Sequence, residues 1–518
     1  MGRLSLIRKC QPWPWLLFAC AYGLSAATYF VVRYGGRWTD TDTSALTQAI
    51  RVFQAEGTLL PQGVNYSTGY AYQAIAAFLL NITGLDANFL QMIILPFIGV
   101  GLMGVIFFVF FREITDNDAL AALGTILLYS HGDFLYVSLR GSHEKITWPL
   151  AAVSIFLLLR SIRSVRSPQV FATCVVLFYV AVFALASTNF FFSSSFILAL
   201  GLSLLFASAW LRITRRKGLS RHTEGFVYRY LLLLGASLAV LAIVIFYAYP
   251  PAKYSLLTLN TLQEQLLALF LSYEPQHNPY EIVSYGWVSR QLYFWLTIIN
   301  YVLLVTSGLT LLDMLVKRKF HEPRHFMVAL FYVSFSVQLF LGAIADFTGL
   351  LGANMQLRLL PTFILFAIAL TLIGLQQLLQ TGRRARFFVL AAIPLLLAIF
   401  SFNALLKATN EPLVSNYWFF FTPQERAGME WANANLRNSS IWLDQDYIRL
   451  HSLWYQIFDS YSTTNWPDSG IADTSTRMFL VSSANRQLSV RQQRPLPIDP
   501  DALRIYDNGA AELYRLRA

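Results

Sequence analysis

Charged residues are scarce in this chain of 518 residues: they make up 13% of it, whereas hydrophobic residues make up 56%. Soluble domains carry roughly a quarter charged residues, so the composition excludes an ordinary soluble enzyme and a disordered protein. Cysteine is scarce too, and the three cysteines lie in or beside apolar segments, so no disulfide framework is expected. The mean hydropathy of +0.50 instead predicts a polytopic membrane protein.

Long apolar runs carry this prediction, because a helix that crosses about 30 Å of hydrocarbon needs roughly 20 apolar residues. Eleven candidate runs lie at approximately 13–33, 89–111, 117–131, 145–160, 169–187, 190–211, 228–249, 291–316, 326–345, 357–378 and 387–406. The third and fourth runs are short, which indicates tilted or broken helices. The first run is too long and aromatic for a cleaved signal peptide.

Basic residues gather between these runs, for example after the fourth (Arg160, Arg163) and the tenth (Arg383, Arg384). With eleven spans, every basic cluster and the N-terminus lie on the cytoplasmic side. If a further apolar stretch at 70–82 also crossed the membrane, the later basic clusters would lie on the opposite side from the N-terminus. This stretch is therefore interpreted as an interfacial helix. The clusters then act as topology signals beside anionic lipid, and no nucleic-acid partner is expected.

This count divides the chain into a membrane domain, 1–406, and an extracytoplasmic α/β domain, 407–518. The membrane domain has long outer loops at 34–88 and 250–290. The expected location is the plasma membrane, by default a prokaryotic inner membrane, with membrane lipids as neighbours. The absence of cysteine from the loops and the compact size favour that default.

Local patterns predict the elements of the C-terminal domain. Thr422 and Glu425 form the Thr-x-x-Glu pattern of a capping box, with proline at the first helical position. The segments 441–447 and 478–483 have the character of short strands, and Asn508-Gly509 is a hairpin signal.

Two acidic residues, Asp40 and Asp42, follow the first span directly. Ionisable groups at a membrane face are costly, so their presence there suggests a function. Either carboxylate would serve as a base that activates an acceptor, or as a ligand of Mg²⁺ or Mn²⁺. The alternative is that one of them caps the helix that follows, and the two interpretations are compatible.

The second outer segment, 131–145, is dense in ionisable side chains. They are His131, Asp133, Arg140, His143, Glu144 and Lys145. These side chains are candidates for substrate binding or catalysis. The alternative is that they belong to a solvated loop held by ion pairs. A second carboxylate-bearing segment on the face that carries Asp42 nevertheless favours a shared site, with Glu144 as a further catalytic or metal-binding candidate.

Two other positions suit substrate binding. Arg358 lies at the outer start of the tenth span, where its planar guanidinium would bind a phosphate, or else extend to the interface as a structural residue. The loop at 250–290 supplies His277, Glu274 and Tyr285, which suit sugar binding or anchoring at the interface.

This organisation resembles the GT-C membrane glycosyltransferases, which include oligosaccharyltransferase catalytic subunits, protein O-mannosyltransferases and lipid A aminoarabinose transferases. The resemblance lies in the order of the segments along the chain. One span is followed by a long outer loop that opens with acidic residues (TDTDTSALTQAIRVFQAEG), then by further spans and an outer C-terminal domain. Asp42, Leu46 and Ala49 approximate the spacing of the mannosyltransferase motif, with Thr43 in place of its glutamate and Leu46 in place of its aromatic residue. Glu144, or else Asp133, matches the second acidic position of the family.

The resemblance implies a polyprenyl-phosphate-linked sugar donor and inverting transfer to a glycan, lipid or protein acceptor on the outer face. Asp42 would deprotonate or orient the acceptor, and a basic group such as Arg358 would stabilise the departing phosphate. A divalent cation is required by some members only, so no cofactor is certain. The alternatives are a flippase or transporter of lipid-linked saccharides, or an O-antigen ligase or polymerase.

Overall fold

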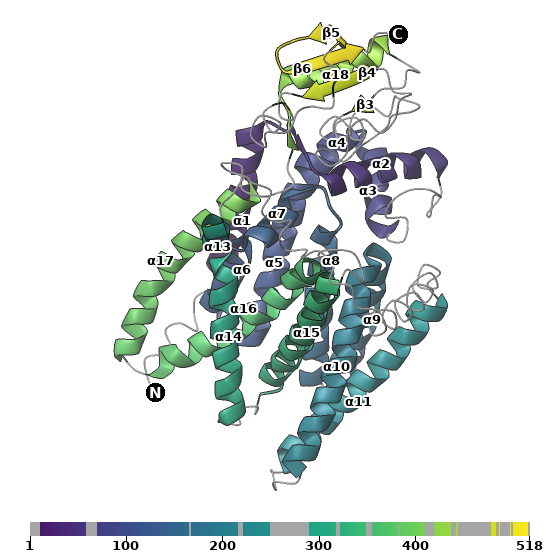
Figure 1. Ribbon diagram of the computed structural model, residues 1–518. Helices are drawn as coiled ribbons and strands as arrows, with labels where there is room; N and C mark the ends of the chain where they lie inside the picture. The colour runs from purple at the N-terminus through teal and green to yellow at the C-terminus, as the bar shows by residue number, and fades with distance from the viewer. Residues whose placement is uncertain are drawn as a thin grey trace.

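The structure is a computed structural model of the chain. It describes residues 11–57, 70–164, 167–215, 221–248, 290–317, 322–348, 355–381, 383–409, 419–436, 442–443, 478–482, 486, 498 and 501–515. The predicted site residues His277, Glu274 and Tyr285 lie outside these ranges. The protein is a helical bundle with a small sheet at one end (Figure 1).

The membrane prediction is confirmed: within the described ranges ten helices are long and apolar enough to span, or up to eleven if one bent pair is counted as a span. The ten are α1 (Trp13–Tyr34), the continuous run of α4 (Ala87–Phe89), η2 (Leu90–Ile94) and α5 (Leu95–Thr115), then α8 (Glu144–Arg163), α9 (Pro168–Thr188), α10 (Phe190–Arg215), α11 (Arg221–Ile243) with η3 (Val244–Ala248), α14 (Ile298–Val316), α15 (Pro323–Thr348), α16 (Met355–Thr381) and α17 (Arg383–Ala408). The expected run at 291–316 is divided, because a short helix α13 (Arg290–Leu296) precedes α14.

The third predicted span is the bent pair. Helix α6 (Asp118–Tyr129) ends and α7 (Gly132–Leu139) begins at an angle of 77° to it. The expectation of an outer loop at 131–145 is therefore wrong for most of its length, because Phe134, Leu135 and Leu139 are buried. His131 caps the start of α7 through its side chain, Arg140 follows the last residue of the helix, and Glu144 and Lys145 belong to the start of α8.

The segment between the first two spans contains α2 (Thr41–Glu56) and α3 (Tyr70–Thr83), which pack against each other. At 14 residues, α3 is too short to span the hydrocarbon, as expected of an interfacial helix. Both helices lie at the same end of the bundle as the C-terminal sheet (Figure 1).

The C-terminal elements are those predicted. Helix α18 (Pro423–Asn435) starts with a complete capping box of Thr422 and Glu425. A four-stranded sheet has the order β3-β4-β6-β5. Its strands are β3 (Trp442–Leu443), β4 (Met478–Ser482), β5 (Leu503–Asp507) and β6 (Ala511–Arg515).

A short pair of strands joins two segments that lie far apart in the sequence. In β1 (Trp38–Thr39) the chain pairs antiparallel with β2 (Phe419–Phe420), immediately before Asp40. The hydroxyl of Tyr34 also donates a hydrogen bond to the carbonyl of Thr409 at 2.9 Å. The segment that carries the acidic residues is thus held against the start of the C-terminal domain.

Close helix contacts hold the bundle, because hydrocarbon gives little hydrophobic drive for helices to associate. In α16, a Cβ added at Gly374 would lie 2.2 Å from Oγ1 of Thr310 on α14. That hydroxyl already donates to the carbonyl of Thr306 at 2.8 Å, so it has little freedom to move away.

We therefore expect Gly374→Ala to lower the free energy of unfolding by about 1–3 kcal/mol through overpacking. Gly308→Ala in α14 is the matched control, since no atom lies within 4 Å of a Cβ there and alanine favours a helix. Thermal unfolding of both variants in detergent tests this, and equal midpoints would contradict it.

Candidate active site

Two adjacent glycines and an N-cap position the acidic segment. Gly35 and Gly36 have φ of 61° and 74°, which only glycine adopts easily, and they turn the chain out of α1. Asp40 then caps α2 by accepting a hydrogen bond from the backbone N–H of Thr43 at 3.0 Å. Asp42 lies in the first turn of α2, with 29% of its side chain exposed, whereas Asp40 is fully buried. The capping interpretation is confirmed for Asp40.

The guanidinium of Arg140, at the C-terminal end of α7, lies among three carboxylates. Its Nη1 is 2.7 Å from Oδ2 of Asp42 and 3.5 Å from Oδ2 of Asp40, and its Nη2 is 3.2 Å from Oε1 of Glu144. We call these four residues the carboxylate–arginine cluster. Its formal charge is negative when all three carboxylates are ionised, so the arrangement favours a proton on one of them.

A close backbone approach brings the two acidic segments together. The N–H of Gly141 donates to the hydroxyl of Thr43 at 2.9 Å. A Cβ at Gly141 would lie 2.8 Å from Cγ2 of Thr43, so only glycine fits. The turn between α7 and α8 therefore lies directly against α2, with Arg140 and Glu144 on either side of it.

Several buried polar atoms in and beside this cluster make no hydrogen bond to the described residues. They are Nε of Arg140, Oε2 of Glu144, Nζ of Lys145 and Nε2 of Gln91. Three of these four atoms are donors, and burying a polar group without a partner is costly. The set matches a ligand that is rich in acceptor oxygens.

Neutral side chains that the sequence interpretation missed complete the surroundings. The hydroxyl of Tyr72 donates to Oε1 of Gln91 at 2.5 Å, and the ring of Tyr72 lies 6.5 Å from that of His143. Nε2 of His143 contacts the amide of Asn189, between α9 and α10. Gln91 lies within an apolar run, which was the available signal, whereas Asn189 lies in the polar break between two runs and gave none.

Burial and neighbouring charges change the pKa values of three groups at this site, Asp40, Arg140 and Tyr72. Burial raises the pKa of Asp40; Arg140 opposes this change and Asp42 adds to it. Burial would lower the pKa of Arg140, but Glu144, Asp42 and Asp40 outweigh it and raise the pKa above the usual value. Burial, followed by the charge of Glu144, raises the pKa of the Tyr72 hydroxyl.

The structure brings six predicted residues together: Asp40, Asp42, Arg140, His143, Glu144 and Lys145. Asp133 lies at the opposite end of α7 and pairs with Lys407. Arg358 is exposed on α16, and no hydrogen bond or ion pair among the described residues joins it to the carboxylate–arginine cluster.

A divalent cation does not fit between Asp40, Asp42 and Glu144 as they are arranged, because the guanidinium of Arg140 stands between them. Across the described ranges, no three His, Cys, Asp or Glu side chains are grouped as metal ligands. We therefore derive no step through a metal.

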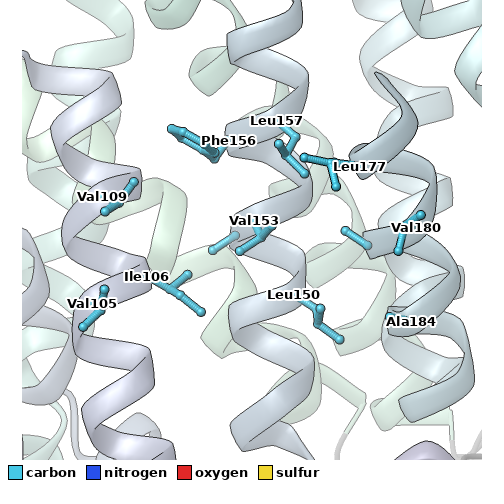
Figure 2. Close-up of a pocket in the computed structure, with 12 residues that line it drawn as sticks. Val105, Ile106, Val109, Leu150, Val153, Phe156, Leu157, Leu177, Val180 and Ala184 are labelled. Carbon is cyan, nitrogen blue, oxygen red and sulfur yellow. The ribbon is translucent and has the colours of Figure 1, made fainter. Parts of the chain in front are cut away.

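An apolar groove of about 410 Å³ lies apart from this polar chemistry, between α5, α8 and α9 (Figure 2). All twelve lining residues are apolar, among them Ile106, Leu150, Val153 and Ala184. The groove lies along the contact between α5 and α8. Nearer the start of α8, the aliphatic part of Lys145 packs on Gly99 of α5, where an added Cβ would lie 2.7 Å from Cδ of Lys145.

Searches against models of protein families and against characterised proteins find no match. Two solved proteins are similar in structure. ArnT from Cupriavidus metallidurans bound to undecaprenyl phosphate is 12% identical, with a TM-score of 0.52 over 95% of this chain and 97% of that one. The Archaeoglobus fulgidus oligosaccharyltransferase, tethered to an acceptor peptide with the NVT sequon, is 11% identical, with a TM-score of 0.52 over 93% of this chain and 71% of that one.

The chain has a GT-C-like fold. The resemblance seen in the sequence is confirmed at the level of the fold. At 11% and 12% identity the likeness concerns the fold alone, so the substrates have to be argued from the residues of this chain.

The raised pKa of Asp40 predicts a pH dependence. A carboxyl whose pKa is higher in the folded state contributes stability below its unfolded pKa of about 4 and loses it as the pH rises through the folded value. Asp40→Asn keeps a capping oxygen and removes the titration. The unfolding midpoint of wild type minus that of the variant should fall as the pH rises above about 4; a rising difference would contradict the burial effect.

Arg140→Met leaves three carboxylates facing one another without their shared partner. We expect it to lower the free energy of unfolding by about 3–5 kcal/mol, as for a buried ion pair that loses one member. Arg426→Met removes an exposed pair with Glu430 and should cost below about 1 kcal/mol. Chemical unfolding in detergent measures both, and a similar small loss in each would contradict the role of Arg140.

Proposed function

We propose that this protein is a membrane glycosyltransferase that moves a sugar from a polyprenyl-phosphate-linked donor to an acceptor on the outer face of the membrane. The observation that carries the proposal is the carboxylate–arginine cluster with its unpartnered donors, at one end of a GT-C-like fold. ArnT, which shares the fold, was crystallised with undecaprenyl phosphate, the lipid part of such a donor.

Asp42 is the best candidate for the group that activates the acceptor. It has the most exposed side chain of the three carboxylates, so an acceptor reaches it first. In inverting transfer the acceptor atom bonds to the anomeric carbon, the carbon–phosphate oxygen bond breaks, and Asp42 takes the acceptor proton. Arg140 holds the Asp42 carboxylate in place at 2.7 Å, and Asp40 fixes the turn that presents it.

Arg140 and Lys145 are the candidates for stabilising the phosphate. Both keep buried donor atoms without partners, and cations or N–H groups already aimed at developing charge lower a barrier most in a water-poor site. The departing phosphate gains negative charge as the bond breaks, and these donors would meet it. Arg358, exposed on α16, is less well situated for this role.

The two ends of α8 differ in charge, and this difference supports a location of the candidate site at the outer face of the membrane. Glu144 is its first residue and Arg160 lies in its last turn, roughly 24 Å further along the axis at 1.5 Å per residue. Arg160 and Arg163 pair with Glu113, and by the positive-inside rule this end is cytoplasmic. The acidic end is then extracytoplasmic, as is the C-terminal domain beside it.

The apolar groove supports a lipid-linked donor. Leu150 follows Lys145 by about 8 Å along α8, so a phosphate at Lys145 leaves the groove within reach of the attached hydrocarbon chain. Its apolar lining provides no hydrogen-bonding side chain for a free sugar, but it suits the hydrocarbon of an isoprenoid.

Transfer of label from radiolabelled polyprenyl-phosphate sugars tests the proposal in membranes at equal expression. Asp42→Asn should reduce transfer by roughly 10²–10⁴-fold, the usual contribution of a general base. Asp313→Asn, a carboxylate paired with Lys317 on α14, is the matched control and should retain full activity.

Equal transfer by wild type and Asp42→Asn would move the base to Asp40 or Glu144. If no labelled donor is consumed but labelled lipid crosses the bilayer only when the protein is present, the enzyme proposal fails and a flippase takes its place.

A further inference from the structure

A second polar cluster lies at the bend between α6 and α7, away from the carboxylate–arginine cluster. We call its residues, His131, Asp133, Tyr293, Asn300 and Lys407, the bend cluster. His131 caps α7: its Nδ1 accepts from the N–H of Phe134 at 3.3 Å, and its Nε2 lies 2.5 Å from Oδ1 of Asn300 on α14. An accepting Nδ1 makes Nε2 the donor to Asn300, so one ring tautomer satisfies both bonds.

An ion pair ties this bend to the last span. Nζ of Lys407, in the final turn of α17, is 2.6 Å from Oδ1 of Asp133, in the first turn of α7. The ammonium also lies 5.3 Å from the centre of the Tyr293 ring. Only 4% of the Lys407 side chain is exposed, so its ammonium is largely desolvated, whereas 27% of the Asp133 side chain is exposed.

The stem of Lys407 is fitted to the backbone of α7. A Cβ added at Gly132 would lie 2.9 Å from Cδ and 3.1 Å from Cβ of Lys407. Nearby, Oγ of Ser130 is 3.2 Å from Oγ of Ser401 on α17. The end of α17 and the start of α7 are therefore joined by packing as well as by charge.

The bend cluster differs from the candidate site in one respect. Within the described residues, none of its buried polar side-chain atoms lacks a hydrogen-bond partner, whereas Arg140, Glu144, Lys145 and Gln91 each have one that does. A fully satisfied buried network gives rigidity and does not require a ligand. The bend cluster therefore has the character of an anchor.

Helix α7 connects this anchor to the candidate site. Its eight residues extend roughly 12 Å, with Asp133 in the first turn and Arg140 directly after the last. Tyr136 lies between them: its hydroxyl is 3.5 Å from Oδ2 of Asp40, and Arg140 lies 5.4 Å from the centre of its ring. A shift of α7 at its first turn would move the guanidinium by a similar amount.

We propose that the Asp133–Lys407 ion pair positions α7 and, through it, Arg140, so that Lys407 is a positioning residue for the candidate site. The inference rests on the proposed function only for the identity of the ligand, a polyprenyl phosphate. The contacts of Lys407 with α7 do not depend on that function. Lys407 touches none of the reacting groups and acts only through α7. Thr409, two residues after Lys407, accepts the hydrogen bond from Tyr34 of α1, so the pair lies beside a contact between the end of α17 and the end of α1.

Two measurements on Lys407→Met test the positioning. The first is amide hydrogen exchange of the full-length protein in detergent. Exchange in residues 133–140 should rise on the order of tenfold, while exchange in α15 stays as in wild type, which also verifies folding. Lys317→Met, which removes a lysine paired with Asp313 on α14, should leave residues 133–140 unchanged. Unchanged exchange in Lys407→Met would overturn the proposal.

The second measurement is binding of undecaprenyl phosphate, used as the probe. Lys407→Met should weaken binding on the order of tenfold in the wild-type background and have little further effect when Arg140 is already lysine. Lys407→Arg should restore most of the affinity. Full additivity of Lys407→Met and Arg140→Lys would show that Lys407 does not act through Arg140, and would overturn the inference.

If wild type does not bind undecaprenyl phosphate, the proposed donor fails, and the hydrogen-exchange result alone decides the positioning role. Should Lys407→Met fail to fold, Asp133→Asn removes the same pair from the partly exposed side and carries the same two expectations.

Discussion

The arrangement of Arg140 among Asp40, Asp42 and Glu144 is the interaction on which the rest of the site depends. Three carboxylates this close would repel one another, and each would favour a proton. One guanidinium with a rigid set of donors lies between them and reduces this repulsion, and its planar fork gives each a defined direction. The bend at α7, the glycine at 141 and the cap on α2 all serve to bring these four side chains together.

Contacts at both ends of α7 explain why the fold tolerates a short helix in place of a full span. A helix end has free backbone groups, and both ends of α7 satisfy them with side chains or turns. His131 caps one end, and the turn of Arg140 and Gly141 leads into α8 at the other. The acidic Asp133 and the basic Arg140 also match the polarity of the helix. Each therefore stabilises α7 while its charged atoms point to different partners.

Much of the fold follows from apolar periodicity and basic clusters, which report where hydrocarbon and cytoplasm lie. The ten spans, the interfacial α3 and the capped α18 were predictable for that reason. The bend at 131 was not, since a short apolar run does not distinguish a straight helix from a broken one. The convergence on Arg140 depends on contacts between segments about 100 residues apart, which local patterns do not encode. Gln91, a polar residue within an apolar stretch, was a visible but unused signal.

The pairing of β1 with β2 has a consequence for how the protein is made. Thr39 lies beside Asp40 near the start of the chain, yet its partner Phe419 follows roughly 380 residues later. At ribosomal speeds of about 5–20 residues per second, that strand emerges some 20–75 s after the first. During this interval the acidic turn has left the ribosome without the strand that holds it. Assembly of the candidate site is therefore among the last events of biogenesis, and a chain truncated before β2 would insert its spans with that end of the bundle unfinished.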